Sequence, residues 1–184
     1  MKKKILLLLS LCLMLLVISC GKHPAVKDFE DSMKIIQSGD YGNNANMAQL
    51  KQSGMDEETL KALAEGSKKI TYKINKTETK KDEAVINVTM KSPDLSGVQQ
   101  ELIQKITSIN PNDLLGKTES EMEKFGQDLA FNLIKEKLKS PELKFREKTF
   151  DVVYTKTDNK WTPNPASNLE FLDMTSFGLL NTGK

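Results

Sequence analysis

The pattern that most constrains the fold is a pair of alternating apolar runs, which occurs twice along the chain. In the first pair, apolar residues fall at every second position over 70–74 and again over 84–90, with a polar turn at 80–82. The second pair starts with the alternating residues of 150–154 and returns after the polar turn 157–160. Alternation of period two on both sides of a short polar turn predicts a β-hairpin. We therefore expect two hairpins in an antiparallel sheet.

Helical periodicity fills the rest of the chain. Pro24 suits the first turn of a helix that stops at Gly39. Asp56 is a predicted N-cap for a second helix that ends at Gly66, and a short helical turn is expected over 47–50. Three capping boxes predict the starts of further helices. They are Ser96 with Gln99, Thr118 with Glu121, and Ser167 with Glu170.

The helix that starts at Thr118 carries a wide apolar stripe, which predicts that it is mostly buried. The stripe consists of Met122, Phe125, Leu129, Phe131, Leu133, Ile134 and Leu138. Helices grouped between hairpins predict an α+β fold, as a single domain over 24–180 with a helical insertion at about 96–140. A half-solvated antiparallel sheet must cover its apolar face, and the helices from Pro24 and Thr118 are the expected covers.

The N-terminal segment predicts export. Three lysines at 2–4 precede a run of fourteen residues over 5–18 that is apolar apart from one serine. This run is too short for a membrane span, which needs roughly 20 residues, and is typical of a cleaved signal. The run ends in Val17-Ile18-Ser19-Cys20-Gly21, which resembles the bacterial lipobox. The resemblance implies a diacylglycerol thioether on Cys20 and cleavage between Ser19 and Cys20.

Residues 1–19 are thus expected to be a lipoprotein signal peptide, and 20–23 a lipidated cysteine with a short tether. Two or more acyl chains such as palmitate give stable anchoring, at about 0.8 kcal/mol for each buried methylene. The membrane is then a partner through the covalent lipid on Cys20. The protein is expected on the bacterial cell membrane, facing outward or into the periplasm. His23 is interpreted as an exposed linker residue.

Composition excludes several classes of function. The 27 basic and 25 acidic residues give a net charge of +2, without the basic excess that is typical of nucleic-acid binding. Two Cys and one His cannot by themselves complete a four-ligand structural zinc site, so neither a metal nor another cofactor is expected. A Gly-rich phosphate loop, a Gly-x-Ser-x-Gly elbow and a His-Glu-x-x-His motif are all missing from the sequence.

The order of motifs is similar to cystatin-like domains of the nuclear-transport-factor-two type. The matching segments are Val26-Lys27-Asp28-Phe29, Ser38-Gly39-Asp40-Tyr41, Lys73-Ile74, Glu83-Ala84-Val85-Ile86-Asn87-Val88 and Lys160-Trp161. Together with Cys20, they make the chain resemble small bacterial lipoproteins that carry such a domain and have no known common function. The resemblance implies a strongly curved sheet around a long helix, which leaves a conical pocket. The insertion at 96–140 departs from the simplest members.

Three aromatic residues, Tyr72, Tyr154 and Trp161, are candidate linings of that pocket. The resemblance includes enzymes with this fold, the relatives of ketosteroid isomerase and scytalone dehydratase, which use a carboxylate in the pocket together with Tyr or His. Asp151 is expected to point outward, and neither it nor Asp173 is assigned a catalytic role. The first interpretation is therefore a non-enzymatic, lipid-anchored domain that binds a small apolar ligand or an envelope protein. The alternatives are a surface isomerase or dehydratase with a carboxylate near Tyr72 or Tyr154, and a structural subunit of an envelope complex.

Overall fold

The computed structural model describes residues 22–39, 54–110 and 115–180. Ser19, Cys20 and the helical turn expected over 47–50 lie outside these residues. The expected fold class is confirmed, because the described chain forms an open, four-stranded antiparallel sheet with helices packed on it. Among the described residues, no helix has the length and apolar character that a membrane span requires.

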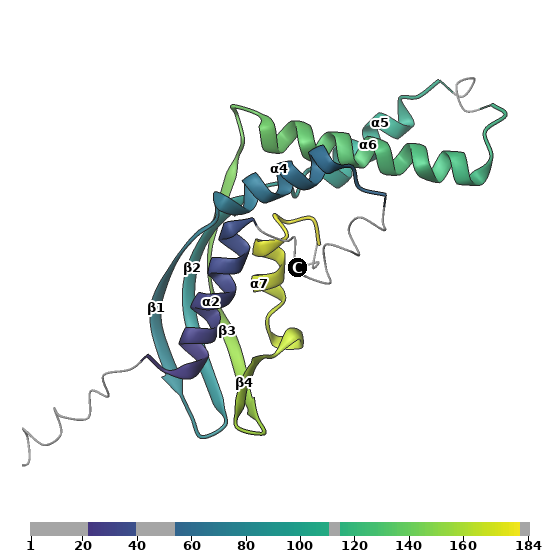
Figure 1. Cartoon of the computed structure of the whole chain (residues 1–184). Helices are drawn as coiled ribbons and strands as arrows, with labels where there is room; N and C mark the ends of the chain where they lie inside the picture. The colour runs from purple at the N-terminus through teal and green to yellow at the C-terminus, as the bar shows by residue number, and fades with distance from the viewer. Residues whose placement is uncertain (1–21, 40–53, 111–114, 181–184) are drawn as a thin grey trace, which may run out of the picture.

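The elements follow the chain in the order shown in Figure 1. The helices are α2 (Pro24–Ser38), α4 (Glu57–Lys68), α5 (Val98–Thr107), α6 (Glu119–Lys139) and α7 (Leu169–Thr175), with a 3₁₀ turn at Pro165–Ser167 before α7. The strands are β1 (Thr71–Thr79), β2 (Glu83–Pro93), β3 (Phe145–Thr157) and β4 (Lys160–Pro163).

Both predicted hairpins are present, and the sheet order is β1-β2-β3-β4. β3 is longer than the alternating run at 150–154, because it pairs with the whole length of β2. The ladder runs from the pair Glu83 and Thr155 to the pair Pro93 and Phe145. Every second side chain of the central strands therefore lies on one apolar face of the sheet. Ile86, Val88 and Val152 on this face are fully buried.

Two helices cover this apolar face, and one of them was not expected. Helix α2 lies across the curved sheet and inserts Phe29 and Met33, both fully buried (Figure 1). The second cover is the short helix α7, which buries Met174 against β2 and β3. The expectation that the helix from Thr118 covers the sheet is wrong. Since Pro93 and Phe145 are paired at the end of the sheet, the chain between them leaves the sheet at that end, and α6 packs on α4 and α5 instead.

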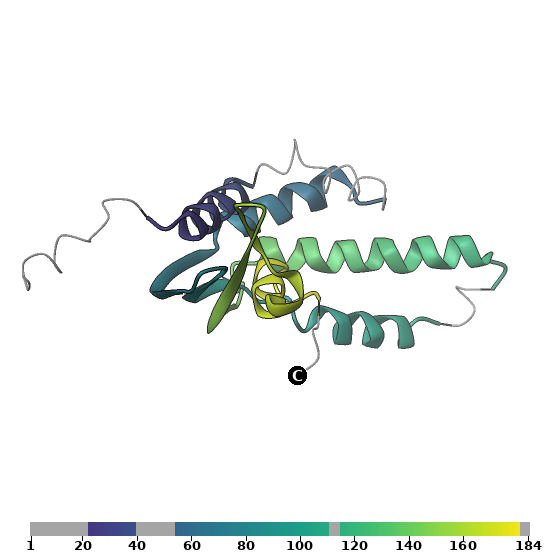
Figure 2. The same cartoon turned by 90° about the horizontal axis from the view of Figure 1, so that it is seen from below.

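The structure therefore has two regions. The body consists of the sheet, α2, α4, α7 and residues 129–139 of α6. The arm consists of α5 and residues 119–128 of α6, and it projects away from the end of the sheet in both views (Figures 1 and 2). The prediction that the wide stripe of α6 is mostly buried holds only in the body. Leu133 is 1% exposed, but Met122 in the arm is 46% exposed.

Two of the helix ends were predicted correctly. Asp56 caps α4 by accepting a hydrogen bond from the Thr59 backbone N–H at 2.6 Å. Gly39 ends α2 in the left-handed conformation, with φ of 64°. The predicted stop at Gly66 is wrong, because α4 continues to Lys68. The glycine lets α6 pack closely there, since an added Cβ would lie 2.9 Å from the Leu138 side chain.

One of the three predicted capping boxes is present. Thr118 and Glu121 exchange both expected hydrogen bonds at the start of α6. The Ser96 box is wrong, because the Ser96 hydroxyl instead donates to Asp94 at 2.6 Å and α5 begins one residue later without a side-chain cap. The Ser167 box is wrong too. Ser167 ends the 3₁₀ turn, where its N–H donates to the side chain of Asn164.

Candidate functional site

The three candidate pocket residues lie around α2, inside the curve of the sheet. Tyr154 on β3 is 2% exposed, while Tyr72 on β1 and Trp161 on β4 are partly buried against the same core. The Tyr72 ring meets Phe29 edge to face, with 5.3 Å between the ring centroids. Phe29 also contacts Phe171 of α7 at 5.8 Å. Side chains of α2 and α7 thus pack together beside Tyr72, and a pocket-lining role for the three residues stays a prediction.

A carboxylate does lie beside Tyr154, as the enzymatic alternative requires. Burial, the negative charge of Asp28 and a hydrogen bond with Asp28 together raise the pKa of Tyr154 far above its usual value. Burial and the charge of Glu30 also raise the pKa of Tyr72. A general acid or base works best with a pKa near the operating pH, and these shifts move both phenols further from it. We therefore interpret the contact between Tyr154 and Asp28 as a structural one, which joins α2 to β3.

His23 is not the exposed linker residue that the sequence suggested. Its Nδ1 atom accepts a hydrogen bond from the Ala25 backbone N–H at 3.3 Å, which caps α2. Its ring lies against Trp161 edge to face, at 4.8 Å between centroids. Next to it, Lys22 forms an ion pair of 2.6 Å with Glu30. Lys22 and His23 therefore belong to the folded body, and a position just before Pro24 was the signal for a capping role.

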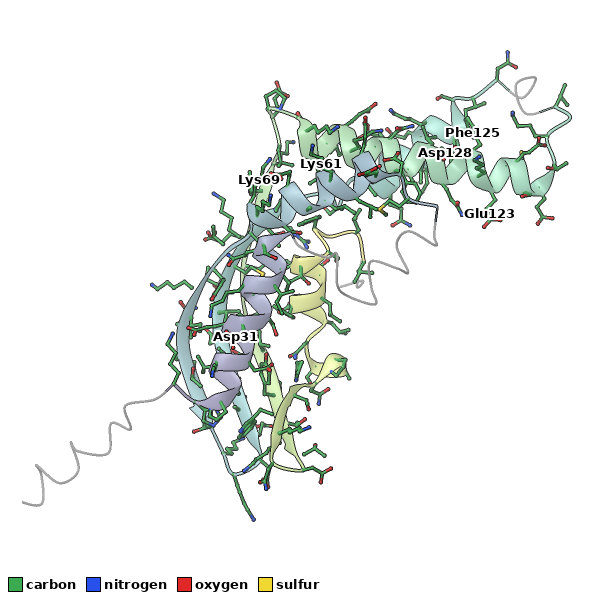
Figure 3. All side chains as sticks on the ribbon, viewed as in Figure 1. Asp31, Lys61, Lys69, Glu123, Phe125 and Asp128 are labelled. Atoms are coloured by element: carbon green, nitrogen blue, oxygen red, sulfur yellow. The ribbon has the colours of Figure 1, made fainter. Side chains whose placement is uncertain are left out.

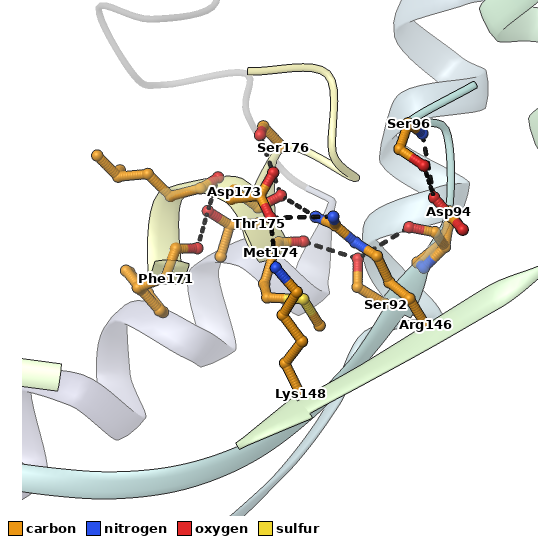
Figure 4. Close-up of polar contacts among 12 residues, drawn as sticks. Ser92, Asp94, Ser96, Arg146, Lys148, Phe171, Asp173, Met174, Thr175 and Ser176 are labelled. Atoms are coloured by element: carbon orange, nitrogen blue, oxygen red, sulfur yellow. Dashed lines mark hydrogen bonds and ion pairs between the residues drawn. The ribbon is translucent and has the colours of Figure 1, made fainter. Parts of the chain in front are cut away.

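A charged cluster that sequence reasoning missed joins α7 to the sheet (Figure 4). The Asp173 carboxylate, 8% exposed, accepts from Arg146 at 2.9 Å and from Lys148 at 3.2 Å, both on β3. Arg146 also donates to the Asp173 carbonyl oxygen. The Ser92 hydroxyl of β2 donates to the Met174 carbonyl oxygen at 2.7 Å. The signal available in the sequence was Arg146, the only arginine of the chain.

This cluster holds the fold together and leaves little for a ligand. The carboxylate is paired with two cations, and the Arg146 Nε atom is buried without a partner among the described residues. Buried charge pairs of this kind are costly to break, since removal of one member leaves the other uncompensated. Asp151, by contrast, points outward as predicted, where it accepts from Asn87 at 2.6 Å.

A polar groove of about 400 Å³ lies between the start of α5 and the end of α6. It is lined by Asp94, Ser96, Gly97, Lys137, Ser140, Glu142, Leu143 and Lys144. Partial burial acts to raise the pKa of Asp94, but two hydrogen bonds from Ser96 lower it overall. The Asp94 carboxylate is therefore ionised, and it already accepts hydrogen bonds from Ser96. Leu143 is the single apolar side chain of the lining, so the groove is a poor match for an apolar ligand. Among the described residues, no group of three or more His, Cys, Asp or Glu is placed to hold a metal ion.

Comparison with known proteins adds one distant likeness. The chain matches no protein-family profile and no curated protein sequence. It is similar to the crystal structure of ycdA, a candidate lipoprotein of Bacillus subtilis, at 21% identity and a TM-score of 0.42. The alignment covers 81% of this chain and 45% of the other, so this chain spans less than half the length of ycdA.

Proposed function

We propose that the protein is a lipid-anchored lipoprotein of the bacterial envelope, whose folded part binds another molecule and does not catalyse a reaction. In this proposal residues 1–19 are removed, and Cys20 becomes the lipidated first residue. Residues 24–180 form one domain, with the helical insertion at about 96–140. The observation that carries the proposal is the run Val17-Ile18-Ser19-Cys20-Gly21, after a charged start and a short apolar stretch.

The start of the folded body supports an anchored arrangement. Gly21 alone separates Cys20 from Lys22, which is already held by its ion pair with Glu30. A lipid on Cys20 would therefore keep the first turn of α2 close to the bilayer surface. In Figure 1 the two hairpin turns lie at this same end of the body, and the arm lies at the other end. An anchor at one end leaves the opposite end free for a partner.

The side chains that could do chemistry support binding over catalysis. Tyr154 is buried with a raised pKa, and Asp173 is neutralised by two cations. His23 caps a helix and lies against an aromatic ring. Each of these groups has a structural partner, which accounts for its position without a reaction.

Lipid labelling in living cells tests the anchor. Cells that express the natural protein, Cys20→Ala or Cys12→Ala are grown with an alkyne analogue of palmitate and extracted with a detergent that separates into two phases. We expect the parent and Cys12→Ala to carry the label and enter the detergent phase. Cys12→Ala is the matched control, because that cysteine belongs to the apolar run of the signal. Cys20→Ala should carry no label, and labelling of Cys20→Ala at the parent's level would overturn the proposal. The label is read in place of membrane fractionation, because an uncleaved signal can hold the variant in the membrane without lipid.

A further inference from the structure

The arm exposes large apolar side chains on both of its helices. Ile103 and Ile106 on α5 are 55% and 42% exposed, and Met122 and Phe125 on α6 are 46% and 38% exposed. Both pairs are three residues apart, a spacing that places two side chains on one face of a helix. Exposed apolar residues that occur together, and not singly, are typical of interaction surfaces.

Acidic residues surround the apolar pair on α6. Glu119, Glu121, Glu123 and Asp128 lie in this segment with one lysine, Lys124. Figure 3 marks Phe125 with Glu123 and Asp128 on the outer half of the helix. None of these four carboxylates takes part in an ion pair within the described chain. The arm segment of α6 thus keeps a net negative charge.

The body segment of the same helix is different. Lys135 pairs with Asp56 and Glu58, and Lys137 pairs with Glu101 at 2.6 Å. Leu133 and Leu138 are buried beneath these pairs. Within the described chain, the charged residues of one half of α6 have ion-pair partners and its apolar residues are buried, whereas the acidic residues of the other half have no cation partner and Met122 and Phe125 are exposed.

We propose that the arm is a docking surface for a basic amphipathic helix of a protein partner. This proposal deepens the proposed function, on which it rests for the setting of the partner in the envelope. Apolar side chains of the partner would pack on the exposed residues of α5 and α6, in the way that an amphipathic helix lies in a groove. Lysine or arginine side chains along its edges would face the unpaired carboxylates, which provides selectivity and speeds association.

The charge and the position of the arm favour this partner over a lipid surface. Bacterial membranes carry anionic lipid, which repels a segment with four carboxylates that have no cation partner among the described residues. The arm also lies at the opposite end of the molecule from the start of α2 in both views (Figures 1 and 2). A second copy of the chain would bring the same negative charge to the contact.

Peptide binding to the purified full-length lipoprotein in detergent tests the proposal. The probe is a synthetic helical peptide with leucine along one face and lysine elsewhere, and its pair carries glutamate in place of lysine. Fluorescence anisotropy should show binding of the lysine peptide only, and the binding should weaken as salt is raised. Met122→Ser with Phe125→Ser should weaken it roughly tenfold or more, as expected for anchor residues. Ile35→Ser with Leu169→Ser, two body residues of similar exposure, should leave it unchanged.

A charge-reversed variant, Glu123→Lys with Asp128→Lys, should lose the lysine peptide and gain the glutamate peptide. Equal binding of the lysine peptide to the parent and to the Met122/Phe125 variant would overturn the proposal. So would arm-dependent binding to anionic vesicles, or arm-dependent self-association in ultracentrifugation. Circular dichroism checks that each variant retains its helices. Because the lipid label reports only on Cys20, a failed anchor and a failed docking surface give separate results.

Discussion

The two halves of α6 belong to one helix and carry one apolar stripe, yet they differ in burial. In the body, Leu133 is 1% exposed because α4 packs on that half. In the arm, Met122 is 46% exposed, and the ion pairs that join α6 to α4 and α5 within the described chain all lie in the other half, at residues 135–139. An apolar stripe therefore predicts which face of a helix can be buried. Which part of that face is buried depends on the helices that pack against it.

The largest difference in stability is expected between substitutions of two aspartates, one in the body and one in the arm. Asp173→Asn should destabilise the protein by about 3–5 kcal/mol, because the largely buried Arg146 would be left without its counter-charge. Asp128→Asn in the arm should change the free energy of unfolding by less than about 0.5 kcal/mol, since that carboxylate has no cation partner in the described chain. Urea unfolding followed by circular dichroism measures both. Equal effects would mean that the cluster of Figure 4 does not hold α7 to the sheet.

Truncation of one apolar residue in each half of α6 tests the burial difference directly. Leu133→Ala should cost about 2–5 kcal/mol through lost burial and a cavity. Met122→Ala should cost less than about 0.5 kcal/mol, because almost half of that side chain is already in water. Thermal unfolding curves of the two variants would compare them. A large loss for Met122→Ala would show that the arm is covered by some other part of the chain.

Alanine substitutions at three glycines distinguish the cost of backbone strain from the cost of a close contact. Gly39→Ala should cost about 1–3 kcal/mol, because its φ is positive and the new Cβ would lie 2.7 Å from the Ala64 carbonyl oxygen. Gly116→Ala also has a positive φ, but no atom of the described residues beyond its two chain neighbours lies within 4 Å of the new Cβ, so it should cost about 1–2 kcal/mol at most. Gly126→Ala, inside α6 with open space around it, should stabilise by about 0.5–1 kcal/mol. Denaturant midpoints give the order, and a loss for Gly126→Ala would show a contact on the arm.

Loss of the cap of α4 should have a modest effect on stability, together with a pH dependence. Asp56→Ala should cost about 1 kcal/mol, while Asp56→Asn keeps an acceptor oxygen and should cost less. The hydrogen bond from the Thr59 backbone N–H lowers the pKa of Asp56 in the folded state. The folded protein therefore gains stability from this group above the ordinary aspartate pKa and loses it as pH falls below about 4. Unfolding curves from pH 7 to pH 3 should fall less steeply for Asp56→Ala than for the parent. Parallel curves would contradict the role of the cap.

The local parts of the fold could be predicted from the sequence, because they depend on neighbouring residues. Alternation gave both hairpins, and Asp56, Thr118 and Gly39 mark the helix ends they were expected to mark. The Ser96 box failed for a local reason as well, since Asp94 is nearer and takes the hydroxyl.

The parts that could not be predicted depend on pairing between distant residues. Which helix covers the sheet follows from the pairing of Pro93 with Phe145, across more than fifty residues of insertion. The burial of His23 depends on Trp161, which lies at the other end of the chain. The Asp173 cluster likewise needs α7 to meet β3. Periodicity carries no information on such contacts, so these residues appeared neutral or linker-like.

The mass of the intact protein, purified from cells that express the natural sequence, tests the central claim most directly. The account predicts a chain that begins at Cys20, with a diacylglyceryl group on the sulfur and a further acyl chain where the cell adds one. Fragmentation should place the added mass on the first residue. A chain that still begins at Met1, or one with a free thiol at position 20, would contradict it.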